Sequence, residues 1–122
     1  MKRNSGFTLI ELVAVMVILA ILAVVAVPQF VDLRTDARQA AVSGVAGALS
    51  SAATLNFAQR SVNPANGTAI ANCTGVATAL QGGAMPAGFV ITAGAVAAGA
   101  TATCTVTHPG GETATFTAIG IL

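Results

Sequence analysis

The sequence predicts an α+β fold, in which a long amino-terminal helix packs on a small antiparallel β-sheet. The helix is predicted by an almost unbroken apolar stretch, residues 7–27, followed by helical periodicity to about residue 57. The sheet is predicted by strict alternation of threonine with apolar residues over 100–108 and 112–119. The chain has 122 residues, of which 55% are hydrophobic and 7% charged, so it is too apolar for disorder and long enough for one small domain.

The apolar stretch has the length of a membrane span, since a helix over residues 7–27 is about 30 Å long. Lys2 and Arg3 precede it and predict a cytoplasmic amino terminus, with the rest of the chain outside. A cleaved secretory signal, with small residues at 24–26, explains these cues equally well. Glu11 interrupts the apolar stretch, where a carboxylate is costly. Thr8 and Glu11 fit a capping box, which explains how the acid is tolerated.

Residues 6–12 read GFTLIEL, and an apolar run follows them to Pro28. This pattern resembles the processing motif of type IV prepilins and of the pseudopilins of type II secretion. The resemblance implies a pilin fold, cleavage between Gly6 and Phe7 by a prepilin peptidase, N-methylation of Phe7 and retention of the apolar helix. It also implies that Glu11 pairs with the Phe7 amine of a neighbouring subunit. Residues 30–38 and 44–61 are similar to pilins of the mannose-sensitive haemagglutinin (MSHA) type.

Pro28 is expected to kink or locally break the helix, because proline lacks the amide hydrogen. Beyond it, residues 30–57 form the amphipathic half of the helix. Its expected packing face consists of small and apolar residues at helical spacing: Leu33, Ala37, Ala40, Ala41, Gly44, Ala48, Ala52 and Leu55. Two acids and two arginines lie on opposite sides of this half: Asp32, Asp36, Arg34 and Arg38. An ordinary solvated face is one explanation, and our hypothesis is that these charges set the lateral register between subunits.

The carboxy-terminal half begins with a loop signal at residues 63–67 and has weak helical character over 74–81. Strands are expected over 89–92, 100–108 and 112–119, with a turn at 109–111. In an exported domain, Cys73 and Cys104 should form a disulfide, which would contribute about 3–4 kcal/mol. The expected organisation is a leader (1–6), a membrane and filament-core helix (7–29), the amphipathic half (30–57) and a globular part (58–122).

No catalytic residue, metal site or cofactor is predicted. His108 is the single histidine and has no catalytic set around it in the sequence, so it is expected to be a surface residue. With Cys73 and Cys104 it makes only a weak case for zinc. Glu112 is the single acid after Asp36, which disfavours the calcium site of the major pseudopilins. A net charge of +1, without Tyr or Trp, gives no direct sign of nucleic-acid binding.

The sequence is therefore interpreted as a non-enzymatic structural subunit, MSHA-like, of a type IV pilus-like surface filament. Its expected partners are copies of itself, the prepilin peptidase and methylase, the pilus assembly machinery and inner-membrane lipid. The precursor is expected in the inner membrane with its carboxy-terminal part in the periplasm, and the mature subunit in an extracellular pilus. Adhesion, motility and DNA uptake are not distinguished. The alternatives are a type II secretion pseudopilin and a secreted soluble binding domain released by signal peptidase.

Overall fold

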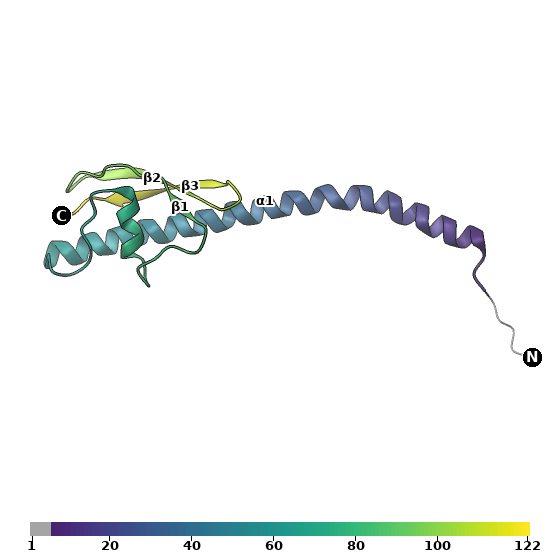
Figure 1. Ribbon diagram of the computed structural model, residues 1–122, viewed down its shortest axis with the longest axis horizontal. Helices are drawn as coiled ribbons and strands as arrows, with labels where there is room; N and C mark the ends of the chain where they lie inside the picture. Colours follow the sequence, from purple (N-terminus) through teal and green to yellow (C-terminus); the bar gives the residue numbers. More distant parts are fainter. Residues whose placement is uncertain (1–5) are drawn as a thin grey trace, which may run out of the picture. The chain divides into compact units, whose positions relative to one another are not determined.

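The computed structural model describes residues 6–122, apart from the side chain of Val31. It confirms the α+β fold. The elements in chain order are helix α1 (Leu9–Val62), the 3₁₀ helix η1 (Cys73–Ala79), and strands β1 (Val90–Ile91), β2 (Thr101–Thr107) and β3 (Thr113–Ile119) (Figure 1). The chain divides into two compact units between Thr35 and Asp36, and each is described by itself. The predicted leader falls outside the described residues, except for Gly6.

Helix α1 is longer at its carboxy-terminal end than predicted. It ends at Val62 rather than near residue 57, because the first strong stop signal is Pro64, which disfavours helical backbone at Asn63. Arg60 Nη1 donates to the carbonyl of Pro64 at 2.7 Å and closes this end. The predicted break at Pro28 does not occur, since the helix runs through this residue. Pro28 removes one intrahelical donor, the amide that would have reached the carbonyl of Val24.

The sheet has the strand order β1-β2-β3 and is antiparallel throughout. The threonine alternation predicts its two faces correctly, since Cys104 pairs with Phe116 and both are buried, whereas Thr103 pairs with Thr117 and both are exposed. The loop between β2 and β3 is the predicted turn at 109–111. Gly111 has φ +100°, the left-handed conformation that ends a three-residue hairpin loop.

The hydrophobic core of the second unit lies between the sheet and the carboxy-terminal half of α1 (Figure 1). The helix contributes one stripe at helical spacing: Val42, Ala46, Leu49 and Ala53. The predicted packing face was wrong, because all its members except Ala52 are exposed. Val42 and Leu49 bury more apolar area than the Ala and Gly of the predicted face, so this stripe gains more from packing.

Two connections tie the loops of the second unit to its core. The predicted disulfide is present, joining Cys73 of η1 to Cys104 of β2 with a Cα–Cα distance of 5.8 Å. The second connection is the amide of Asn56, which is 4% exposed. Its Nδ2 donates to the Thr68 carbonyl and its Oδ1 accepts from the Thr68 amide, both at 2.8 Å. The amide thus satisfies two backbone groups of a loop that would otherwise lack partners.

Candidate functional site

The start of α1 is held by the capping box that the sequence predicts. The Thr8 amide donates to Glu11 Oε2 at 2.8 Å, and the Thr8 hydroxyl donates to the same oxygen at 2.9 Å. In return, the Glu11 amide donates to the Thr8 hydroxyl oxygen at 3.3 Å. The contacts are reciprocal, so Glu11 stabilises the helix start within its own chain.

The geometry leaves part of Glu11 available to a second partner. Both Thr8 donors reach Oε2, and Oε1 accepts no hydrogen bond from the described residues. Phe7 precedes the helix and is 95% exposed. Phe7 and Glu11 also line one surface hollow together with Leu12, Ala14 and Val15. A donor from another molecule can therefore approach Oε1 without breaking the cap.

The large apolar side chains that the structure describes in the first unit are exposed. Large side chains around the whole circumference of the helix are exposed, from Leu12 (58%) to Val27 (63%). An 18-residue window of this helix has a mean hydropathy of 3.1, and none of it is buried inside the protein. By length and composition this part of α1 could cross a membrane, and a signal sequence near the amino terminus would meet the same criteria.

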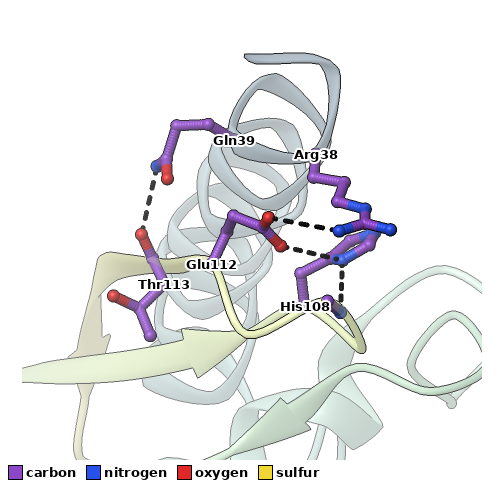
Figure 2. A network of polar contacts seen from close by, with 6 residues as sticks. Arg38, Gln39, His108, Glu112 and Thr113 are labelled. Atoms are coloured by element: carbon purple, nitrogen blue, oxygen red, sulfur yellow. Dashed lines mark hydrogen bonds and ion pairs between the residues drawn. The ribbon is translucent and has the colours of Figure 1, made fainter. Parts of the chain in front are cut away.

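The four charges expected to set subunit register differ in their surroundings. Asp32, Arg34 and Asp36 are exposed, and no ion pair is recorded for them within residues 6–122. Arg38 is half-buried, and its Nη1 lies 3.7 Å from Glu112 Oε1 at the β2–β3 turn (Figure 2). Next to it, Gln39 Nε2 donates to the Thr113 carbonyl at 3.1 Å. Arg38 therefore has a role inside the subunit.

The sequence interpretation missed the cluster around Glu112. His108 Nδ1 lies 3.4 Å from Glu112 Oε2, and both side chains are largely buried, at 19% and 13% exposure (Figure 2). His108 is thus not the surface residue that was expected. Its ring meets Phe89 edge-on, with 5.1 Å between the ring centroids. One signal was available, because His108 and Glu112 flank a three-residue loop and so must lie opposite each other across the hairpin.

The cysteines do not contribute to a metal site. Both sulfurs belong to the disulfide, so neither is a thiolate that could bind zinc beside His108. In the part of the chain that the structure describes, no group of three or more His, Cys, Asp or Glu side chains could hold a metal ion.

Comparison with known families identifies the amino terminus. Residues 1–27 match the family model of the prokaryotic N-terminal methylation motif. The chain has the amino terminus of a type IV pilin-type prepilin. No curated protein and no solved structure matches the chain.

The prepilin motif accounts for the two features of the first unit, its exposed apolar helix and its acid near the start. It implies processing by a prepilin peptidase and is typical of structural subunits rather than enzymes. The match ends at residue 27 and includes neither the sheet nor the charges after Pro28. The MSHA-type assignment therefore stays a prediction.

Proposed function

We propose that this prepilin is the structural subunit of a type IV pilus-like surface filament. The observation that carries the proposal is an N-terminal methylation motif joined to an apolar helical segment, none of which is buried among the described residues. In this proposal the precursor waits in the inner membrane, is cut after Gly6 and N-methylated at Phe7, and then polymerises through its amino-terminal helix. The disulfide-closed second unit faces outward and serves adhesion, motility or DNA uptake.

Lipid explains why assembly needs a polar contact. Apolar helices gain little hydrophobic free energy on leaving a bilayer for one another, because lipid tails are as apolar as leucine. A buried carboxylate and a buried ammonium are each costly alone, and each satisfies the other. Glu11 Oε1 accepts no hydrogen bond within the described residues, so it is the group that we assign to the Phe7 amine of a neighbour. That pair fixes the axial offset between subunits.

We assign lateral register to the exposed charges Asp32, Arg34 and Asp36. Arg38 contributes less to this contact than the sequence suggested, because it also pairs with Glu112. Pro28 leaves the carbonyl of Val24 without its helical donor, so the helix lacks one hydrogen bond just before it. We propose that this segment is where α1 adjusts during assembly.

A pseudopilin role shares the same motif and is the alternative within this class. The surroundings of Glu112 support the pilus instead. It is the single acid after Asp36, and its carboxylate faces Arg38 and His108 rather than an open ligand site. Calcium sites need several oxygen ligands, usually with Asp or Glu among them.

Electron microscopy of sheared cell-surface material tests the proposal, with wild type compared to Glu11→Ala and Glu11→Gln. Glutamine can maintain a capping box but carries no charge. We expect filaments from the wild type and none from either variant. Mass spectrometry of the wild-type filaments should give a subunit that starts at N-methylated Phe7.

The two variants separate the possible roles of Glu11. Normal filaments from Glu11→Gln, with none from Glu11→Ala, would mean that the residue only caps the helix. Thr8→Ala is the matched control, because it removes the hydroxyl contacts and keeps the charge, and it should still give filaments. A mature wild-type chain that starts at Val27 would overturn the filament proposal and support a secreted domain.

A further inference from the structure

One imidazole nitrogen faces two partners at the β2–β3 turn. The Gly110 amide donates to His108 Nδ1 at 2.8 Å, and Glu112 Oε2 lies 3.4 Å from the same Nδ1 (Figure 2). An imidazole nitrogen accepts a hydrogen bond only without a proton and donates one only with a proton. The two contacts therefore belong to two states of Nδ1, one without a proton and one with a proton.

The carboxylate beside His108 lacks a donor while Nδ1 accepts from the Gly110 amide. Glu112 Oε2 is buried and accepts no hydrogen bond from the described residues. The other oxygen, Oε1, lies 3.7 Å from Arg38 Nη1. A buried acceptor without a donor costs about 1–3 kcal/mol, and more when it is charged. A proton on His108 Nδ1 would supply the missing donor.

The elements around the ring hold it between these two partners. Helix α1 contributes the cation Arg38, the turn contributes Glu112, and the chain before β1 contributes the uncharged ring of Phe89. Within residues 6–122, no other charged group is recorded in contact with His108 or Glu112. Gly110 packs closely on the Arg38–Glu112 ion pair. A Cβ atom at this position would lie 2.6 Å from Glu112 Oε2 and 2.8 Å from Arg38 Cδ.

We propose that His108 is a proton-controlled latch of the β2–β3 turn. When Nδ1 carries no proton, it accepts a hydrogen bond from the Gly110 amide, and this bond closes the turn. When Nδ1 takes a proton from solvent, it donates to Glu112 Oε2, and the Gly110 amide is released. The Glu112 contact therefore forms when Nδ1 carries the proton and is lost when the proton leaves.

Nuclear magnetic resonance of the full chain in detergent micelles tests the latch, and the test does not depend on filament formation. The readouts are the His108 ring nitrogens, the Gly110 amide and the Glu112 carboxylate carbon, followed from pH 8 to pH 5. We expect all three to change with one shared midpoint, and the Gly110 amide to lose its hydrogen-bonded shift in acid. The Gly111 amide, which donates to the His108 carbonyl at 2.9 Å, is the internal control and should change less.

His108→Asn is the matched variant, because asparagine can accept from the amide two residues ahead but does not titrate. Its Gly110 resonance should stay constant over the same pH range. A Gly110 amide that stays constant in the wild type while His108 titrates would overturn the latch. So would a Glu112 carbon that does not follow His108, or a variant whose Gly110 amide changes as in the wild type.

Discussion

The two halves of α1 treat their apolar side chains in opposite ways. Over residues 12–27 the helix is apolar on all sides, and every large side chain is exposed. Over residues 42–56 it buries one stripe against the sheet and leaves the other sides exposed. A helix that is apolar all round needs a membrane or other helices as its solvent, whereas a one-sided helix belongs to a globular domain. Among the described residues, the second half therefore packs on the sheet, whereas the first half leaves its apolar side chains exposed.

Leu49→Ala should give the largest stability loss and tests the internal half of this comparison. Leu49 is fully buried, so its truncation should lower the free energy of unfolding of the second unit by about 2–5 kcal/mol. Leu55→Ala is the matched control, since Leu55 lies on the same half of α1 and is 64% exposed. Urea unfolding of the full chain in detergent, followed by circular dichroism, measures both. Equal losses would show that the two sides of the helix do not differ.

Removing the disulfide should cost an amount whose upper limit is lower than that for Leu49→Ala. The bridge joins residues separated by 31 positions, which corresponds to about 3–4 kcal/mol in the chain-entropy model. The double variant Cys73→Ser, Cys104→Ser should unfold at lower urea, and reduced wild type should behave in the same way. Cleavage after Gly6 should be unchanged in the double variant, because the first unit contains neither cysteine. Loss of cleavage would contradict the independence of the two halves.

The smallest expected change in stability is that of Arg38→Gln, and Arg34→Gln should show none. Arg38→Gln should lower the free energy of unfolding by about 1 kcal/mol or less, since partly exposed ion pairs contribute little. Arg34→Gln should leave it unchanged and reduce filament yield instead, because no partner for Arg34 is recorded in the described residues. Urea unfolding and filament yield from sheared cells measure both variants. Together they test whether Arg38 acts within the subunit and Arg34 between subunits. A stability loss that is larger for Arg34 would reverse these assignments.

Local patterns in the sequence predict much of this fold. Alternating threonines predict β2 and β3, and the spacing of Thr8 and Glu11 predicts the cap. The buried face of α1 was not predictable in the same way, because its amphipathic half has apolar residues on two sides. Side-chain size decided between them, in favour of Val42 and Leu49 over a row of Ala and Gly.

Part of the candidate site was also predictable, and part was not. The processing motif, Glu11 and the cysteine pair are local or compositional signals. The ion pair between Arg38 and Glu112 has no such local signal. It joins two residues far apart in the sequence and depends on how the hairpin packs on α1. The periodicity of each segment does not predict that Arg38 and Glu112 lie close together. From the sequence, Arg38 is therefore expected only on the subunit surface.

The cap at Thr8 also bears on how a single subunit could be stored before use. A carboxylate surrounded by hydrocarbon costs several kcal/mol unless donors reach it. Thr8 supplies two donors from the same helical turn, so an isolated chain does not need a second copy to tolerate Glu11. The proposed cleavage after Gly6 would add a positive charge one residue before that turn. It would change the charge at the helix start while the Thr8–Glu11 cap stays in place.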